Sequence, residues 1–469
     1  MKRYAKRATG ALLASLLASA CGSSAKAEPP APAPEVFLST FTAGQSPLTI
    51  GVIITEEAGQ RGYSDYPLAA GARVAQYRLD QGSSDPVRLV VVDDQGTRAG
   101  SVSAVEQLAK DGAVGIVYAS QGQHILGGVA TAKADKIAVL DPYETSTSGF
   151  GAGAWLTGPD DTQIEAAMSS FVRAQQLPPP LVVTGPGAGG LTYKGRYASS
   201  LTLTASDTSA FIASAIAAKV ASVEKVSHAT NPPPAIVIAG ATVSAEVVAG
   251  LEHQAVTTIL LGPGATTPLF SDTLASLQSG TGPLSGATTQ GVFYSVGDDA
   301  FDASPQAGNL AFLGALRLAA AEQSEPALTG GGLCFEAGGA ATADRRSEDA
   351  VVALADAAAA AAAKQAPTKA TKTTGQVATP ISAQEVLSEL QSGFRVGLSG
   401  GIAGPSLDFS NVDSLASASS TVIKEATSQT DSSRASYGQP CANGQSAPSV
   451  FQAPPLQWFA VSSTPTSGG

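Results

Sequence analysis

The stretch LTIGVIITEEAGQRGYSDYPLAAGARVAQYRLDQGSSDPVRLVVVDD, residues 48–94, decides the fold class. It opens with an apolar, β-branched run, Leu48–Thr55, as expected of a strand that is buried on both faces. Apolar residues then recur at helical spacing from Leu68 to Leu79. A second apolar run, Val87–Val92, ends in two aspartates. Strand, helix and strand in this order predict a βαβ unit with parallel strands.

The same alternation continues along the next part of the chain. Further strands are predicted at 114–118, 137–140, 181–184, 235–239, 258–261 and 291–296, and helices at 123–134, 162–175, 207–220 and 243–254. These strands are too many for one sheet of ordinary size, so we expect an α/β protein with two lobes. The glycine-rich stretch Gly149–Gly153, followed by Pro159, is expected to carry the first crossing between them.

Local signals place several helix ends and one irregular segment. Ser103 and Glu106 have capping-box spacing, and Asp207 is expected to cap the helix that follows it. Later, 348–364 and 383–392 have helical patterns, whereas the polar segment 366–382 is expected to be a loop or an insertion.

The charge balance excludes two classes of partner. The 469 residues include 27 Lys and Arg against 38 Asp and Glu, a net charge of −11. Binding to nucleic acid requires clustered basic side chains, so no nucleic-acid partner is expected. Adsorption to anionic lipid through surface charge is equally disfavoured.

The N-terminus predicts export from the cytoplasm. Four basic residues precede a short apolar run, Ala11–Ala18, which is the layout of a signal peptide over residues 1–20. The sequence around Cys21 resembles the lipobox of bacterial lipoproteins, and a lipid on Cys21 would anchor the chain to a membrane face. Residues 21–46 then form a lipidated end and a Pro-, Ala- and Ser-rich tether. Plain secretion after Ala18-Ser19-Ala20 is the alternative.

Two further cysteines remain in this oxidising compartment. Cys334 and Cys441 lie in glycine-rich, loop-like stretches, so we expect them to form a disulfide. Two buried free thiols are the alternative.

Several motifs match catalytic or cofactor patterns only superficially. Gly185–Gly190 fits a dinucleotide-binding fingerprint, but no helical pattern follows it. Ser399 sits in a nucleophile-elbow pattern, but Pro405 prevents the helix that this elbow requires. The three histidines lack spacing typical of metal ligands, and the pairs at 93–94, 160–161 and 298–299 are interpreted as caps and solvated acids. We therefore predict no enzyme activity, no cofactor and no metal.

The quoted stretch, with VRLVVVDDQGTRAGSVSAVEQLAKDGAVGIVYASQGQH and KIAVLDPYETST, resembles the leucine/isoleucine/valine-binding proteins. These are type I periplasmic solute-binding proteins of ABC transporters. The resemblance implies two lobes, each with a mostly parallel, doubly wound sheet, and a ligand cleft between the lobes. It implies discontinuous lobes, 48–157 with 288–395 and 158–287 with 396–469.

The resemblance also implies a set of ligand-binding residues in the first lobe. The loop after the third strand would supply Gln121, Gly122 and Gln123, and the stretch after the fourth would supply Tyr143, through its backbone, and Thr145. Tyr63 would line the rim. Ordinary loop polarity is the alternative explanation of these residues.

The second lobe departs from the pattern of that family. The tyrosine expected there falls near Ala241 and Thr242, and the acidic partner of an α-ammonium group falls near Gly264. An unpaired buried ammonium is costly, so an amide, a carboxylate, an aromatic acid or a peptide-like solute fits as well as an amino acid.

The resulting hypothesis is a monomeric, extracytoplasmic, membrane-anchored lipoprotein that delivers a small polar solute to ABC permease subunits. The alternative is a sensory or envelope-scaffold lipoprotein with the same fold and with altered or no binding of small molecules. An exported hydrolase is a third and weaker hypothesis.

Overall fold

The computed structural model describes residues 47–55, 66–80, 87–120, 122–227, 231–263, 268–286, 292–297, 311–312, 315, 345–365, 380–397, 401–404, 406–410, 416, 422–428 and 456–460. The chain divides into two units, Met1–Pro34 and Glu35–Gly469, and all the described residues belong to the second unit. The predicted signal peptide and tether therefore lie outside the described residues, as do Cys21, Cys334 and Cys441.

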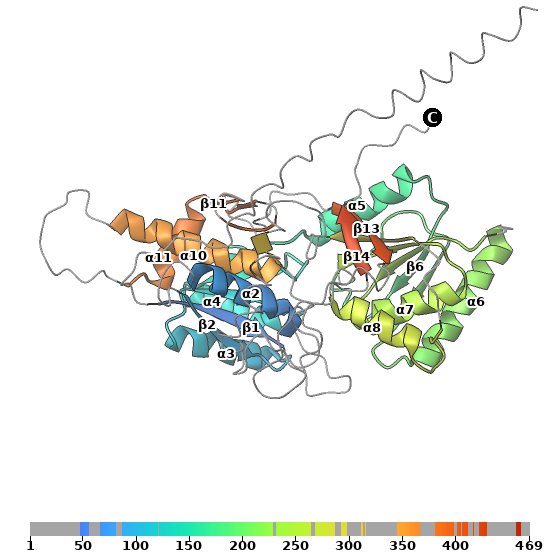
Figure 1. Cartoon of the computed structure of the whole chain (residues 1–469), viewed down its shortest axis with the longest axis horizontal. Helices are drawn as coiled ribbons and strands as arrows, with labels where there is room; N and C mark the ends of the chain where they lie inside the picture. The colour runs from blue at the N-terminus through green and yellow to red at the C-terminus, as the bar shows by residue number, and fades with distance from the viewer. Residues whose placement is uncertain are drawn as a thin grey trace, which may run out of the picture. The chain divides into compact units, whose positions relative to one another are not determined.

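Five parallel strands form the first sheet, in the order β2-β1-β3-β4-β5, and Figure 1 labels β2 and β1. They are β1 (Leu48–Ile54), β2 (Val87–Asp93), β3 (Gly115–Tyr118), β4 (Ala138–Asp141) and β5 (Ala154–Leu156). Every residue of β3, β4 and β5 is buried, which explains why their sequences are continuous apolar runs with little alternation.

Helices cover both faces of this sheet. One face packs against α2 (Tyr66–Asp80), α10 (Arg346–Gln365) and α11 (Ala383–Gln391). The other face packs against α3 (Arg98–Lys110) and α4 (Ile125–Ala134). This is a doubly wound arrangement, and its helices come from two distant parts of the sequence.

Two glycines in the strands allow these helices to approach closely. A Cβ at Gly51 of β1 would lie 2.5 Å from the side chain of Leu108 on α3. A Cβ at Gly115 of β3 would lie 2.6 Å from the side chain of Leu354 on α10. Both distances are shorter than real Cβ contacts, so a larger residue at either position would have to push a leucine side chain aside.

Seven strands form the second sheet, in the order β14-β13-β10-β9-β8-β6-β7. Five are parallel to one another, and β13 and β14 are antiparallel additions at one edge. The strands are β6 (Leu181–Thr184), β7 (Ser199–Thr202), β8 (Ala235–Ile238), β9 (Thr258–Leu261), β10 (Val292–Gly297), β13 (Val422–Ser428) and β14 (Leu456–Ala460).

The second sheet is also covered on both faces. Three helices, α6 (Ser209–Ser227), α7 (Ala241–His253) and α8 (Pro268–Ser279), share one apolar cluster with it. On the other face α5 (Asp161–Ala174) packs through Ile164, Met168 and Phe171. The predicted fold class, α/β with two mostly parallel doubly wound sheets, is therefore confirmed.

The first turn of α10 is held by a buried polar layer. Glu348 is fully buried and pairs with Arg78 of α2, whose guanidinium also donates to Gly401 O at 2.8 Å. Asp349 accepts from the backbone N–H groups of Ala403 and Gly404, at 2.5 and 2.9 Å. This layer joins α2, α10 and residues 401–404.

Two lobe boundaries differ from the sequence expectation. Strand β10 falls in 288–395, the range expected in the first lobe, but it pairs with β9 in the second sheet. The hairpin of β11 (Arg395–Val396) and β12 (Leu407–Asp408) was expected in the second lobe from residue 396, but Val396, Leu407 and their neighbours pack in the first core. An apolar strand fits either sheet equally well, so its sequence does not reveal which one it joins.

Two predicted helix caps are also wrong. Helix α3 begins earlier than expected, and Thr97, not Ser103, caps it by accepting from Gly100 N. Asp207 accepts from Thr204 N, and the hydroxyl of Thr208 accepts from Phe211 N at the start of α6. In both cases a neighbouring hydroxyl takes the capping hydrogen bond, and Thr97 has the extended backbone that capping requires.

Candidate functional site

The carboxyl ends of four neighbouring strands bring polar residues to one edge of the first sheet. Thr55 follows β1, Asp94 follows β2, Ser120 follows β3, and the segment 141–146 ends β4. In open parallel sheets, ligands bind at this edge because loops and helix N-termini converge there. It is therefore where we look for a functional site.

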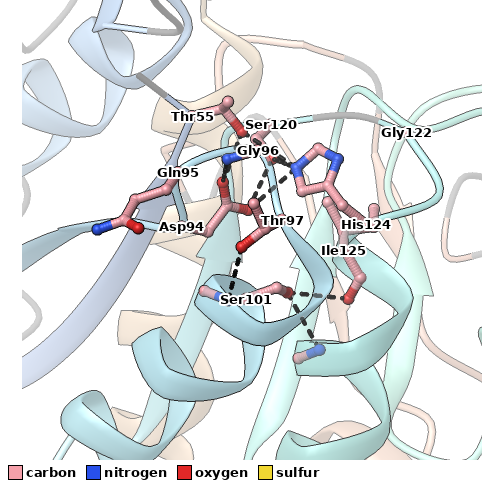
Figure 2. A network of polar contacts seen from close by, with 12 residues as sticks. Thr55, Asp94, Gln95, Gly96, Thr97, Ser101, Ser120, Gly122, His124 and Ile125 are labelled. Atoms are coloured by element: carbon pink, nitrogen blue, oxygen red, sulfur yellow. Dashed lines mark hydrogen bonds and ion pairs between the residues drawn. The ribbon is translucent and has the colours of Figure 1, made fainter. Parts of the chain in front are cut away.

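A buried aspartate organises the first group of side chains (Figure 2). Asp94 is fully buried, and its Oδ1 accepts from Thr55 Oγ1 at 2.7 Å and from Gly96 N at 3.0 Å. Its Oδ2 lies 3.1 Å from His124 Nε2 and accepts from Ser120 Oγ at 3.4 Å. This aspartate is neither a helix cap nor a solvated acid, so its sequence interpretation is wrong.

Serine, histidine and aspartate meet in this group, but not as a catalytic triad. Ser120 Oγ lies 3.4 Å from His124 Nε2, the same ring nitrogen that faces Asp94. A triad needs the hydroxyl on one ring nitrogen and the carboxylate on the other, so that the ring can transfer a proton. The contacts instead hold the loops after β1, β2 and β3 together.

A second group surrounds the end of β4. Asp141 Oδ1 accepts from Tyr143 N at 2.9 Å and from Glu144 N at 2.8 Å. The carboxylate of Glu144 accepts from Gly122 N at 2.9 Å, from Thr145 N at 3.0 Å and from Ser146 N at 2.9 Å. Burial raises the pKa of Asp141 well above its usual value, and the charge of Glu144 raises it further.

Three of the predicted ligand residues lie in or beside this second group. Gly122 has a φ of 115°, which favours glycine, and its N–H points to Glu144. The backbone N–H of Tyr143 is taken by Asp141, as described above. Thr145 donates its N–H to Glu144, its carbonyl accepts from Asp161 N at 2.9 Å, and its hydroxyl hydrogen-bonds the carboxylate of Asp161.

The side chain of Tyr143 points into the protein. Its hydroxyl donates to Leu68 O at 2.7 Å, and the guanidinium carbon of Arg346 lies 4.4 Å from the ring centre. The ring therefore links the β4 loop to α2 and α10. Gln123 is exposed, whereas Tyr63 and Gln121 lie outside the described residues.

A loop from the second sheet comes close to the same residues. A Cβ at Gly189 would lie 3.7 Å from Thr145 Oγ1 and 4.0 Å from Glu144 Oε1, and one at Gly190 would lie 3.0 Å from Asp161 Oδ2. The connection from β6 to β7 contains no helix, as expected from the weak match to a dinucleotide fingerprint. Of the second-lobe positions singled out by sequence, Ala241 and Thr242 start α7, and Gly264 lies outside the described residues.

Sequence reasoning missed Glu144, Thr55 and His124. A carboxylate directly after a buried strand was a usable signal, because parallel strands bring such groups to one edge. Among the described residues, no group of three or more His, Cys, Asp or Glu side chains is placed to hold a metal ion. None of the described helices combines the length and the apolarity needed to span a bilayer.

Comparisons with solved structures identify the fold. The branched-chain amino acid transporter substrate-binding protein LivJ from Streptococcus pneumoniae, in complex with isoleucine, is 16% identical, with a TM-score of 0.56 over 81% of this chain and 96% of that one. A fatty acid ABC transporter substrate-binding protein from Thermomonospora curvata is 14% identical, with a TM-score of 0.54 over 82% and 92%. An ABC transporter substrate-binding protein from Desulfitobacterium hafniense, in complex with leucine, is 14% identical, with a TM-score of 0.51 over 82% and 98%.

These similarities extend over almost the whole length of each solved protein. The chain has the two-lobed α/β fold of the type I periplasmic solute-binding proteins, as the sequence resemblance implied. No protein-family model matches the chain, and no curated protein matches it either.

Proposed function

We propose that this protein is an extracytoplasmic solute-binding protein of an ABC transporter. It captures a small polar solute between its two lobes and presents it to the permease subunits. Specificity comes from groups that line the binding site and from lobe closure, without bond chemistry. The signal peptide, a lipid anchor on Cys21, a monomeric state and a disulfide between Cys334 and Cys441 belong to the same proposal.

One observation carries this proposal: polar groups from four strand ends converge at the edge of the first sheet where this fold places ligands. Gly189 and Gly190 from the second lobe lie against the same groups, as expected for a site shared by the two lobes. The solved neighbours, named as receptors for isoleucine, leucine and fatty acid, support a small solute but do not identify it.

A second candidate function has a specific observation in its favour. Glu144 already accepts from three backbone N–H groups at this edge, and the Tyr143 N–H is taken by Asp141. The number of donors left for a ligand is therefore reduced. A sensory or envelope-scaffold protein with altered or no small-molecule binding would have such a site.

A ligand panel separates the two functions. The purified protein is heated with amino acids, their amides, aromatic acids, polyamines and urea, one at a time, and the unfolding midpoint is recorded. A solute at about 100 times its dissociation constant stabilises the folded state by roughly 2.7 kcal/mol. One stabilising class of solute is the expected result, and Thr145→Ala should weaken that stabilisation. A flat panel would contradict transport and favour the sensory or scaffold function.

A further inference from the structure

Three backbone N–H groups from two different loops point to a single carboxylate. Gly122 lies after β3, and Thr145 and Ser146 lie after β4, with donor–acceptor distances to Glu144 of 2.9, 3.0 and 2.9 Å. Successive backbone N–H groups that converge in this way form an anion-binding nest. The occupant of this nest is part of the chain itself.

Glu144 is held firmly in this position. Only 7% of the residue is exposed, and its own N–H donates to Asp141 Oδ1 at 2.8 Å. Each carboxylate oxygen of Glu144 serves one loop. Oε2 accepts from Gly122 N after β3, and Oε1 accepts from Thr145 N and Ser146 N after β4. A covalently attached carboxylate has a large advantage over a free one, because it loses little translational freedom on binding.

The negative charge of Glu144 contributes to a raised pKa at two neighbouring aspartates, Asp141 and Asp161. It raises the pKa of Asp141, where burial is the larger cause. Burial also raises the pKa of Asp161, the Thr145 hydroxyl lowers it, and the charge of Glu144 adds to the rise. A second carboxylate brought to this place would meet the same repulsion.

We infer that Glu144 is a built-in anion that fills the nest of the first lobe and so excludes solutes that would place a carboxylate there. This inference rests on the proposed function and narrows it. The solute presents an uncharged or cationic polar group, such as an amide, a hydroxyl or an ammonium, to this part of the site. A free carboxylate could enter only by displacing Glu144, which would leave a buried charge without its donors.

Chemical rescue tests the nest without any knowledge of the solute. Glu144→Ala leaves three partly buried N–H groups without their acceptor, and sodium formate or acetate can replace the lost carboxylate. We expect 200 mM formate or acetate, against sodium chloride at equal ionic strength, to raise the unfolding midpoint of Glu144→Ala by about 2–5 °C. The unaltered protein should change by less than about 1 °C.

Glu389→Ala is the matched control. Glu389 is almost as buried as Glu144, at 9%, but its carboxylate accepts from the ammonium group of Lys364, at 2.5 Å, and not from a backbone nest. Formate should therefore not rescue this variant beyond the chloride control. Equal stabilisation of the unaltered protein and Glu144→Ala, or rescue of Glu389→Ala to the same extent, would overturn the inference.

A second variant covers the case in which Glu144→Ala does not fold. Glu144→Gln keeps the volume but has one acceptor oxygen, so one of the two loops loses its partner. Amide hydrogen exchange should be at least tenfold faster in peptides that contain Gly122, or in those that contain Thr145 and Ser146. Unchanged exchange in both segments would overturn the inference.

The ligand panel gives an independent result. If no solute stabilises the unaltered protein but formate rescues Glu144→Ala, the proposed transport function is contradicted. The inference that Glu144 fills the nest is then still supported. If a free amino acid binds the unaltered protein as tightly as it binds Glu144→Ala, transport stands and the exclusion of carboxylates fails.

Discussion

Buried carboxylates organise the loops at the carboxyl edge of the first sheet, whereas the contacts described directly after β6, β8 and β9 of the second sheet come from backbone and hydroxyl groups. In the first, Asp94, Asp141 and Glu144 accept hydrogen bonds from the loops around them. In the second, Gly185 and Gly262 follow β6 and β9, and their N–H groups donate to the carbonyls of Ile238 and Val237.

The difference indicates that charge matters most at the edge of the first sheet and shape at the edge of the second. Under the proposed function, the carboxylates fix a local charge, so the first edge would reject a solute of the wrong sign. Glycines contribute no side chain, so the second edge would permit close approach and select mainly by shape. Removing a key residue should therefore have different consequences in the two lobes.

The largest effect is expected at Asp94. Asp94→Ala removes the acceptor of Thr55 and Gly96 N from a fully buried position, and we expect a loss of about 3 kcal/mol in the free energy of unfolding. Asp93→Ala is the control, because Asp93 is only partly buried and accepts from Gln95 N at an exposed position. Urea unfolding measures both variants. Equal losses would show that the first edge does not depend on its buried carboxylate.

A pair of glycines tests the backbone-built edge. Gly187 and Gly112 have nearly the same φ, +78° and +77°, so alanine carries the same conformational strain at both. A Cβ at Gly187 would also lie 2.7 Å from Gly240 Cα, whereas nothing lies within 4 Å of one at Gly112. Gly187→Ala should therefore cost about 1–2 kcal/mol more than Gly112→Ala in thermal or urea unfolding. Equal losses of stability in the two variants would mean that the backbone around Gly187 can move to accommodate a Cβ atom.

The smallest effect is a pH dependence located in the first lobe. Burial raises the pKa of Asp356 on α10 from 3.8 to about 7, although the charge of Arg78 opposes the rise. The folded state therefore keeps a proton that the unfolded state releases, and stability should fall between about pH 4 and pH 7. Asp356→Asn should raise the free energy of unfolding at pH 8 and leave it nearly unchanged at pH 4, because an amide at this position cannot ionise.

Glu385→Gln is the control of opposite sign. Hydrogen bonds from the backbone and the hydroxyl of Ser382 lower the pKa of Glu385. The ionised Glu385 therefore contributes to the free energy of unfolding at neutral pH, and this contribution is lost as the pH falls below 4.5. Denaturant unfolding at several pH values measures both variants. An Asp356→Asn profile parallel to that of the unaltered protein would contradict the assignment.

The fold was predictable because a strand that is buried on both faces has a continuous apolar sequence, which is visible without knowledge of the rest of the structure. The run in β8 is apolar throughout, that in β1 is apolar apart from Thr49, and α5 shows a clear helical face. Strand β7 was not predicted, because its residues alternate between half-buried and exposed and include two serines. Helix α8 was missed as well, and the joining of β10 to β9 depends on a contact that is distant in sequence.

The candidate site was predicted only in part. The resemblance led to Gly122 and Thr145, and the structure brings both to the same carboxylate. It did not lead to Glu144 itself: the position of this carboxylate after a buried strand indicates the edge of the sheet, but not the N–H group of Gly122 that it meets there. The exposed Gln123 has no described contact that supports a ligand role, and its assignment stays a prediction.

The return of α10 to the first lobe has a consequence for biosynthesis. Residues from Ala350 to Ala358 of this helix cover the face of the first sheet that also carries Leu48 and Ile50. About 200 residues separate β4 from α10, so a ribosome that adds ~5–20 residues per second needs roughly 10–40 s to make them. Throughout that interval one face of the first sheet has α2 but lacks α10 and α11, so a nascent chain in this state cannot complete that core. Such a delay would suit the export that we propose for this protein, because an export channel admits a chain that has not yet folded.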